Sequence, residues 1–344
     1  MKMIDINQIV RPNILTLNPY TSARDAHTGR EGVFLDANEN PYGTLNRYPD
    51  PYQRKLKQKL AILKGVAQEN IFIGNGSDEV IDLAFRIFCN PGEDKVLTFS
   101  PTYGMYSVSA AINNIELINL PLATNFQINM DELSPYLNDS SIKLIFICSP
   151  NNPTGNLIYS ADIELILNQF EGIVILDEAY IDFANRDSLI GLLQSHNNLI
   201  VMQTFSKAWG LAAARLGTAY SSEEIIAIYN RVKPPYNVSA INQQAAIDAL
   251  DNIKNYKEKL ALIKTEKERL ITKLKTIHRI KTIYPSDANF LLIEVTDANR
   301  LYKDLVAKKI IIRNRDKQIA NCLRISIGTA EENEKLINAL RTYA

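Results

Sequence analysis

The chain has 344 residues, of which 46% are hydrophobic, and its 38 lysines and arginines balance 38 aspartates and glutamates. This composition excludes a disordered polypeptide, and the zero net charge excludes a strong positive field that would attract nucleic acid or an anionic membrane surface. We therefore expect a folded protein of about two domains whose partners are small molecules, with neither nucleic acid nor membrane among them.

The cysteines and histidines are few and scattered. Cys89, Cys148 and Cys322 form no Cys-x-x-Cys pair, and the three histidines lack the spacing of metal ligands. A disulfide framework and a cysteine-rich zinc site are therefore excluded, and no metal is expected. No stretch approaches the roughly 18 consecutive apolar residues of a membrane span, and Asp5 and Arg11 interrupt the N-terminal region. These features predict a cytoplasmic protein.

The chain divides into three predicted parts. Residues 1–40 contain several prolines and glycines without a clear hydrophobic period, so we expect an extended arm, which packs with the small domain. Residues 41–240 are expected to form a large domain, because short apolar runs alternate there with helical patterns. Residues 241–344 mix strand and helix patterns and are expected to form a smaller α+β domain.

The large domain is predicted to hold a parallel sheet covered by helices on both faces. Each predicted strand ends in a polar or turn-forming segment, so functional residues should collect at the carboxyl edge of the sheet. The expected strands are Ile71–Ile73, Lys95–Phe99, Lys143–Cys148, Ile173–Leu176, Leu199–Gln203 and Gly217–Tyr220, and apolar residues at helical spacing mark the helices Asp78–Cys89 and Ala161–Phe170.

The C-terminal part begins with a long amphipathic stretch, Ser239–Thr276, which is rich in lysine and glutamate. Its period predicts a helix that is broken near its middle, with the charged residues on a solvated face. Further on, the pattern predicts the strands Asn289–Val295, Ile310–Arg313 and Leu323–Ile327 and the helices Asn299–Lys308 and Glu331–Thr342.

Lys207 and Asp177 each stand at the end of an apolar strand. A lysine in this position can be partly desolvated, which lowers its pKa and increases the fraction of neutral amine able to react with an aldehyde cofactor or a carbonyl substrate. A carboxylate there could pair with the protonated ring nitrogen of pyridoxal phosphate and keep the ring able to accept electrons. Taken alone, Lys207 also fits a surface lysine, and Asp177 fits a cap of the next segment.

Two loops at strand ends are further candidates. The loop Ser149–Gly155 contains two prolines and a glycine, and its Asn152 could donate to a cofactor oxygen. In the second loop, backbone amides near Gly76, Ser77 and Asp78 could receive a phosphate at the positive end of a helix. A purely structural turn and ordinary helix capping by Ser77 are the alternatives.

Considered in their order along the chain, these motifs resemble those of the fold type I aminotransferases that use pyridoxal phosphate, and within them the histidinol-phosphate aminotransferases. The resemblance covers nearly the whole chain. It implies a large domain with a mostly parallel seven-stranded sheet flanked by helices, a smaller α+β domain and an N-terminal arm. The matching segments are Asn18–Tyr20, Asn38–Pro41, Arg47–Asp50, Gly76–Glu79, Pro101–Tyr106, Pro150–Gly155, Asp177–Tyr180, Ser206–Lys207, Arg215–Gly217 and Cys322–Ser326.

The resemblance also implies a role for each candidate residue. Lys207 would anchor pyridoxal 5′-phosphate covalently and move a proton between the substrate α-carbon and the cofactor, and Asp177 would pair with the ring nitrogen. Tyr48 would reach the cofactor phosphate of the neighbouring subunit, which implies a homodimer. The other implied contacts are the ring oxygen with Asn152 and Tyr180, the ring face with Tyr103, the phosphate with Gly76, Ser77, Asp78, Thr204, Ser206 and Arg215, and the substrate with Tyr20, Asn40, Arg313 and Arg324.

The reaction implied is transamination between L-histidinol phosphate with 2-oxoglutarate and imidazole-acetol phosphate with L-glutamate, in histidine biosynthesis. An aromatic amino-acid aminotransferase and a threonine-phosphate decarboxylase share the cofactor residues and stay as alternatives at this point. A cofactor-binding sensor without turnover is disfavoured, because the N-terminal arm has neither a two-helix pattern nor a basic cluster.

Overall fold

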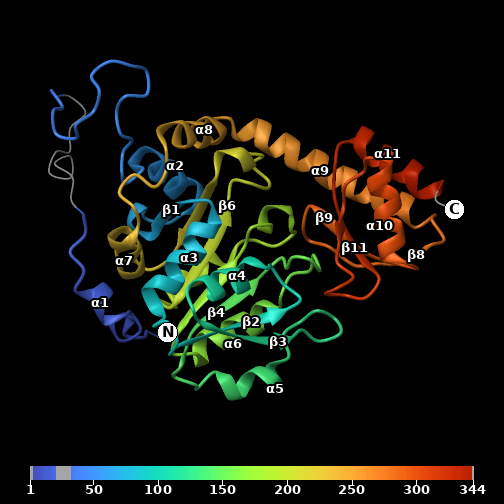
Figure 1. Ribbon diagram of the computed structural model, residues 1–344, viewed down its shortest axis with the longest axis horizontal. Coiled ribbons are helices and arrows are strands. Elements are labelled where there is room, and N and C mark those ends of the chain that lie inside the picture. The colour runs from blue at the N-terminus through green and yellow to red at the C-terminus, as the bar shows by residue number, and fades with distance from the viewer. Residues whose placement is uncertain (1–2, 21–31, 343–344) are drawn as a thin grey trace.

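The computed structural model describes residues 3–20 and 32–342 and contains two sheets (Figure 1). The larger has seven strands in the order β1-β7-β6-β5-β4-β2-β3. All of them run in one direction except β7, which is antiparallel to both of its neighbours. The strands are β1 (Ile71–Asn75), β2 (Lys95–Ser100), β3 (Glu116–Pro121), β4 (Ile142–Cys148), β5 (Ile173–Asp177), β6 (Leu199–Thr204) and β7 (Leu216–Tyr220).

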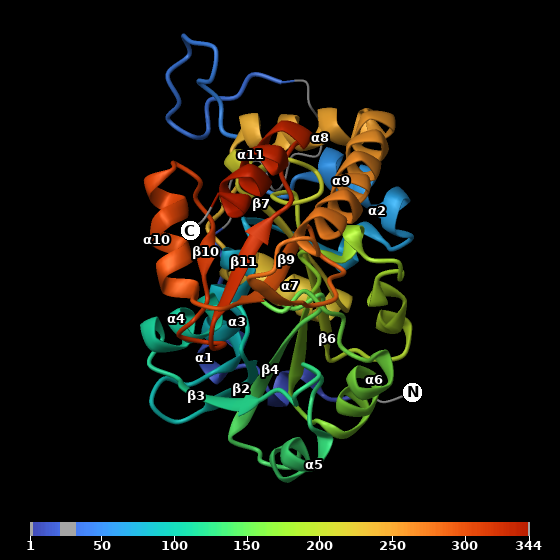
Figure 2. The ribbon, with the colours of Figure 1, turned by 90° about the vertical axis from the view of Figure 1, so that its right-hand side faces the viewer.

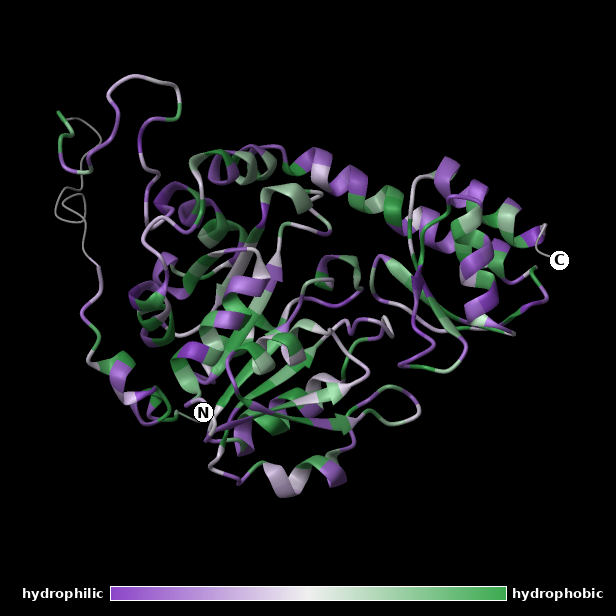
Figure 3. Cartoon of the chain, viewed as in Figure 1, coloured by the Kyte–Doolittle hydropathy of each residue, from purple (hydrophilic) through white to green (hydrophobic). Residues whose placement is uncertain are grey.

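Helices cover both faces of this sheet, as the apolar patterns predict. Neighbouring strand residues point to opposite faces, so that Phe72 joins the core beneath one layer of helices and Ile73 joins the core beneath the other. In Figure 3 the strands are predominantly green and the covering helices alternate between green and purple. One layer contains α3 (Ser77–Phe88), α4 (Met105–Ile112) and α7 (Glu223–Val232), and the other contains α2 (Arg54–Lys64), α6 (Ser160–Gln169) and α8 (Ala240–Asp251).

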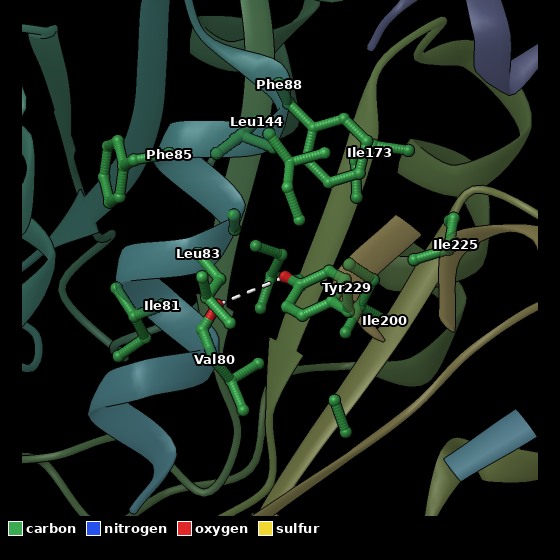
Figure 4. Packing of buried hydrophobic residues seen from close by; sticks show 14 of the residues in the cluster. Val80, Ile81, Leu83, Phe85, Phe88, Leu144, Ile173, Ile200, Ile225 and Tyr229 are labelled. Carbon is green, nitrogen blue, oxygen red and sulfur yellow. Dashed lines mark hydrogen bonds between the residues drawn. The ribbon is translucent and has the colours of Figure 1, made fainter. Parts of the chain in front are cut away.

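The helix α3 is the centre of the first layer. Its buried face packs against the strands and against α7, where the Tyr229 hydroxyl donates a 3.2 Å hydrogen bond to the carbonyl oxygen of Val80 (Figure 4). Gly76 precedes the helix, and Asp78 and Glu79 lie in its first turn, where negative charge complements the helix dipole. This packing holds the N-terminus of α3 at the carboxyl edge of the sheet.

The smaller sheet has four strands in the order β10-β11-β9-β8, all antiparallel. Leu323 and Ile325 point into the core beneath the helices, whereas Phe290 belongs to a separate apolar cluster with Tyr180 and Ala208 of the large domain. This second cluster joins the two domains. The small domain comprises α9 (Ile253–Leu274), β8 (Ile280–Ile283), β9 (Phe290–Val295), α10 (Ala298–Ala307), β10 (Arg313–Asn314), β11 (Cys322–Ser326) and α11 (Ala330–Arg341).

The long predicted helix is divided at Asn252 into α8 and α9. The Asn252 backbone leaves helical geometry, and its side chain accepts a hydrogen bond from the N–H of Asn255 at the start of α9. Figure 1 shows α9 running from the large domain to the small one, and Figure 2 shows the small domain in front of the large sheet. No helix in the described part of the chain is both long and apolar enough to cross a membrane.

The N-terminal segment does not pack as expected. The arm is predicted to pack with the small domain, but Ile4, Ile6, Val10 and Ile14 join the core around α3 in the large domain. The backbone N–H of Ile4 also donates to Asn197 at 3.0 Å. These apolar side chains cover a face of the large domain, which explains the difference. Within the segment, α1 spans Pro12–Leu15, residues 21–31 lie outside the described residues, and the domain boundaries at residues 40 and 240 stay predictions.

Three strands differ from the sequence expectation. The sequence pattern predicts no strand at β3, because the residues of this edge strand are mostly half-buried or exposed and give a weak apolar signal. The strand β8 is missed for the same reason, since its central residues are exposed. The strand expected at Ile310–Arg313 is only the two-residue β10. The helices α2, α4, α7 and the short α5 (Met130–Leu133) also have no counterpart among the predicted helices.

Candidate active site

The carboxyl ends of β1, β2, β4, β5 and β6 meet at one edge of the large sheet, where β7 begins. Loops from these ends supply most of the predicted cofactor residues. This convergence follows from the strand directions, since parallel strands end at the same edge. The residues brought to this edge are Gly76, Ser77, Asp78, Tyr103, Asn152, Asp177, Tyr180, Thr204, Ser206, Lys207 and Arg215.

Asp177 is the last residue of β5 and is 3% exposed. The Tyr106 hydroxyl donates to its Oδ2 at 2.7 Å, and the Ala179 N–H donates to its Oδ1 at 3.0 Å. Burial raises the pKa of Asp177 to about 6, although both hydrogen bonds act in the opposite direction. A carboxylate that is ionised at neutral pH in this buried position suits a cationic partner such as a protonated ring nitrogen.

The N-terminus of α3 lies against the turn before β7. Gly76 has a φ of +81°, and a Cβ atom at this position would lie 2.7 Å from Nη2 of Arg215. A Cβ at Gly217 would lie 2.2 Å from the backbone nitrogen of Ser77. The two glycines therefore let the Arg215 guanidinium and the first N–H groups of α3 share one small region. Backbone donors at a helix start together with a guanidinium are suited to bind a phosphate.

Thr204 and Ser206 shape the adjoining turn after β6. The Thr204 hydroxyl donates to the carbonyl oxygen of Leu216 at 3.2 Å and accepts the Ser206 N–H at 3.0 Å. These bonds hold the turn that carries Lys207 against the start of β7. The first residue of β7, Leu216, directly follows Arg215.

Asp78 connects Tyr103 to Arg215. The Tyr103 hydroxyl donates to Oδ1 of Asp78 at 3.1 Å, and Nη2 of Arg215 lies 3.3 Å from its Oδ2. The Tyr103 ring stands edge-on to that of Tyr106, with centroids 5.6 Å apart and planes at 86°. The aromatic ring is thus held between the candidate phosphate region and the tyrosine that binds Asp177.

Asn152 and Tyr180 lie together on the side of the small domain. The Asn152 side-chain amide donates a 3.4 Å hydrogen bond to the Tyr180 hydroxyl. The side-chain oxygen of Asn152 accepts a hydrogen bond from Nη1 of Arg324. The Tyr180 ring packs edge-on against Phe290 at 5.1 Å. A contact between the domains therefore positions the two predicted ring-oxygen donors.

Asn151 fixes the loop that carries Asn152. It is 1% exposed, its amide donates to the Pro101 carbonyl at 2.9 Å and to the Thr154 hydroxyl at 2.8 Å, and its carbonyl oxygen accepts the Thr102 hydroxyl at 2.7 Å. The loops after β2 and β4 are therefore tied together through one buried amide. The sequence motif contains Asn151, but the contact partners are visible only in the folded chain.

Lys207 lies at the centre of these groups. Its Nζ is 5.6 Å from the centroid of the Tyr180 ring. The side chain keeps access to solvent, and partial burial followed by the positive charge of Arg324 lowers its pKa, while Asp177 acts in the opposite direction. A lowered pKa increases the share of neutral amine, which is the nucleophilic and basic form.

The two predicted substrate arginines face each other across the pair β10 and β11. Arg313 is opposite Arg324 in the antiparallel register. Arg324 is part-buried, contacts Asn152 and lies 5.1 Å from the centroid of the Phe290 ring, whereas Arg313 is exposed. Arg324 therefore contacts the candidate site directly, and Arg313 lies beside it.

The structure does not bring Tyr20, Asn40 and Tyr48 to these residues. The segment that follows residue 31 projects from the large domain on the side away from the small domain (Figure 1). Tyr48 stacks on Tyr236 with centroids 4.3 Å apart, and it lines with Asn40 a separate pocket of about 530 Å³. Tyr20 is 72% exposed. Their assignment to substrate or to a neighbouring subunit's cofactor stays a prediction.

Tyr106 is the main site residue for which the sequence predicted no role. It stands three residues after Tyr103, in the same motif, so the motif was a signal that this region matters. Its function as the donor to Asp177 depends on a contact across 71 positions of the chain, which no local pattern reports.

The chain is similar to known aminotransferases over nearly its whole length. Residues 23–340 match the model of the family described as aminotransferase class I and II. The chain is 48% identical to the histidinol-phosphate aminotransferase of Cytophaga hutchinsonii, over 98% of this chain and 99% of the relative, and 51% identical to that of Christiangramia forsetii, over 99% of each. The chain belongs to the histidinol-phosphate aminotransferase family. Membership confirms the predicted family and the predicted class of enzyme.

Solved structures agree with this result. The histidinol-phosphate aminotransferase of Clostridium acetobutylicum is 26% identical and superposes with a TM-score of 0.79, over 86% of this chain and 90% of that one. The enzyme of Sinorhizobium meliloti, solved with pyridoxal 5′-phosphate, is 25% identical with a TM-score of 0.79, over 89% of each chain. The predicted fold and cofactor are thereby confirmed for this family member.

Proposed function

We propose that this chain transfers an amino group from L-histidinol phosphate to 2-oxoglutarate, or in the reverse direction from L-glutamate to imidazole-acetol phosphate, in histidine biosynthesis. The high identity to histidinol-phosphate aminotransferases over nearly the full length supports this substrate pair. The single structural observation that carries the proposal is that Arg324 of the small domain contacts Asn152 at the sheet edge that also carries Asp177 and Lys207.

The residues present fit pyridoxal 5′-phosphate. Asp177 is a buried carboxylate whose described hydrogen-bond donors, the Tyr106 hydroxyl and the Ala179 N–H, are both uncharged. At Gly76 an added Cβ atom would meet the Arg215 guanidinium, so this cation lies directly against the backbone at the start of α3. Asp177 would hold the ring nitrogen, Asn152 and Tyr180 the ring oxygen, and the α3 N-terminus with Arg215, Thr204 and Ser206 the phosphate. When bound, this cofactor supplies an aldehyde for the amine and withdraws electrons from the bond to be broken.

Lys207 is proposed as the covalent anchor and the general base. Its lowered pKa leaves more neutral amine for both tasks, and its position beside Tyr180 places it next to the group that holds the ring oxygen. As a neutral amine, its Nζ would accept the proton from the substrate α-carbon and hold it for return during the same half-reaction. Asp177, kept ionised by its two donors, would hold the ring in its electron-accepting form.

Arg324, assisted by Arg313, is proposed to hold the anionic end of the substrate. A guanidinium presents donors in a planar fork that matches both a carboxylate and a phosphate. Arg324 suits this role because it faces the large domain and its described side-chain partner, Asn152, is neutral.

We further propose that the enzyme is a cytoplasmic homodimer in which Tyr48 contacts the neighbouring subunit's cofactor phosphate. The segment that carries Tyr48 supports this, because it projects from the large domain and exposes several large apolar side chains: Val33, Leu35, Tyr42 and Leu45. Such residues are normally covered in an assembly. Sedimentation at several concentrations tests the dimer, and a monomer at micromolar concentration would refute it.

The proposed reaction is tested by mixing the purified holoenzyme separately with histidinol phosphate, phenylalanine and threonine phosphate and following the cofactor absorbance in a single turnover. Efficient conversion to the amine form of the cofactor by histidinol phosphate alone supports the proposal. Conversion by phenylalanine alone would identify an aromatic aminotransferase, and release of carbon dioxide from threonine phosphate would identify a decarboxylase. A Lys207→Ala variant that keeps full turnover would refute the role of the lysine.

A further inference from the structure

A third arginine shares the face of Arg313 and Arg324. The N–H of Arg315 donates to the carbonyl oxygen of Cys322 at 2.9 Å, which continues the antiparallel pairing of β10 with β11 by one residue. Because side chains alternate along a strand, Arg315 projects from the same side as Arg313, and Arg313 lies opposite Arg324. Arg324 contacts Asn152 from this side, so the three guanidiniums belong to the face turned toward the large domain.

The positive charges on this face have neutral partners within the described part of the chain. Arg324 donates to the side-chain oxygen of Asn152, and Nη1 of Arg315 donates to the side-chain oxygen of Gln318 at 3.2 Å. The Nε atoms of Arg315 and Arg324 are both buried without a hydrogen-bond partner. None of the ion pairs between described residues includes Arg313, Arg315 or Arg324. Because no carboxylate of the described residues neutralises these neighbouring guanidiniums, they are suited to bind an anion that carries more than one negative charge.

Arg315 interacts electrostatically with residues of the candidate site. Burial, followed by the positive charges of Arg324 and Arg313, lowers the pKa of Arg315 to about 10, and Tyr180 acts in the opposite direction. Tyr180 in turn lies beside Asn152 and Lys207. Arg315 is therefore near the groups that surround the reacting centre, although its own side chain is anchored in the small domain.

The partner of Arg315 also approaches the large domain. Gln318 lines a pocket of about 590 Å³ together with Pro101, Thr102 and Tyr103. The Arg315–Gln318 turn thus lies beside the tyrosine proposed for the ring face. A backbone bond from the Gln318 N–H to the Arg315 carbonyl, 2.8 Å long, closes this turn and limits where the guanidinium can go.

We propose that Arg315 is a specificity-determining residue that favours a substrate ending in a phosphate monoester over one ending in a carboxylate. This inference rests on the proposed function, in which histidinol phosphate and glutamate react in turn at one site. A phosphate monoester approaches two negative charges above its second pKa of about 6 and has three terminal oxygens, whereas a carboxylate has one charge and two oxygens. A third guanidinium therefore strengthens phosphate binding and adds little for glutamate.

The two half-reactions of the holoenzyme, measured separately by stopped-flow absorbance, test this inference. Arg315→Gln should lower kcat/KM for histidinol phosphate by about 10- to 100-fold, the effect of losing one charge-assisted contact, and change that for glutamate by less than about threefold. Arg315→Lys, which keeps the charge without the fork, should restore part of the preference. Lys317→Gln is the matched control, because it removes an exposed positive charge from the same turn and should change neither half-reaction.

Inorganic phosphate gives an independent readout. It should compete with glutamate in the unmodified enzyme and about tenfold more weakly in Arg315→Gln, with Lys317→Gln unchanged. Equal losses in both half-reactions, or no loss for histidinol phosphate, would overturn the role of Arg315. The unmodified enzyme is tested with histidinol phosphate before any variant is made. If it does not convert this substrate at all, the proposed function is refuted, and the role of Arg315 is refuted only by the variants.

Discussion

The Tyr106 hydroxyl donates a 2.7 Å hydrogen bond to Oδ2 of Asp177, and both groups are buried. The bond links the first turn of α4 to the end of β5 across the sheet edge. It explains how a carboxylate can be kept ionised and correctly oriented in an apolar layer, since a charged oxygen without donors would be strongly destabilised there.

Replacing Tyr106 by phenylalanine should therefore weaken both stability and cofactor binding. The loss of one hydrogen bond to a buried charged group predicts a decrease of about 1–3 kcal/mol in the free energy of unfolding, measured with urea on the cofactor-free protein. Cofactor affinity, measured by equilibrium dialysis, should decrease as well, because the pKa of Asp177 rises further.

Tyr229→Phe is the control for this prediction. It also removes one buried tyrosine hydroxyl, which donates to Val80 in the core, but it lies outside the candidate site (Figure 4). It should reduce stability and leave the affinity for the cofactor unchanged. Equal cofactor affinities for the two variants would contradict the role given to Tyr106.

The stability of the cofactor-free protein should decrease as the pH rises from about 4 to about 6. Asp177 has a pKa raised from 3.8 to about 6, so in this window the folded state binds more protons than the unfolded state and the free energy of unfolding falls with pH. The shift corresponds to about 3 kcal/mol at most. Asp177→Asn should lose this part of the slope, and urea unfolding between pH 4 and pH 7.5 measures it. Burial also raises the pKa of Glu178, which contributes equally to the pH dependence of the unmodified protein and of Asp177→Asn. If stability depends on pH with the same slope in these two proteins, Asp177 is not the source of the dependence.

Gly76→Ala should selectively damage phosphate binding. The positive φ of Gly76 costs an alanine about 1–3 kcal/mol, and its Cβ would displace the Arg215 guanidinium. The affinity for pyridoxal 5′-phosphate should fall by about tenfold or more, whereas that for pyridoxal, which lacks the phosphate, should change less. Gly191→Ala is the control, because its added methyl group would have no contact within 4 Å beyond the adjoining backbone. Equal losses for both ligands would argue against a phosphate site at α3.

Asn151→Ala should loosen the loop that presents Asn152. The substitution leaves the Pro101 carbonyl and the Thr102 hydroxyl without their buried partner, which predicts a loss of about 1–3 kcal/mol in the free energy of unfolding. The absorbance maximum of the bound cofactor should also shift, since Asn152 is proposed to bond the ring oxygen. A destabilised variant with an unchanged spectrum would show that Asn151 supports the fold without positioning Asn152.

The sequence by itself determined the strands of the large sheet that are apolar throughout and the loops at their ends. Asp177 and Lys207 were recognisable because each ends or follows a mainly apolar strand, and the parallel direction of these strands places both residues at one edge. Local periodicity was sufficient there, since a buried strand and an amphipathic helix each have a residue pattern of their own. The edge strands β3 and β8 lack such a pattern because half or more of their residues remain accessible.

Only the tertiary structure decided which side chains meet. The donor to Asp177, the anchoring of Asn151, the contact of Arg324 with Asn152 and the shared face of Arg315 all join segments far apart in the chain. The side on which the N-terminal segment packs was decided in the same way, by the apolar surface around α3 that Ile6 covers. These contacts depend on how whole layers pack, and the free energy of that packing is a property of the assembled domains and not of any local stretch of sequence.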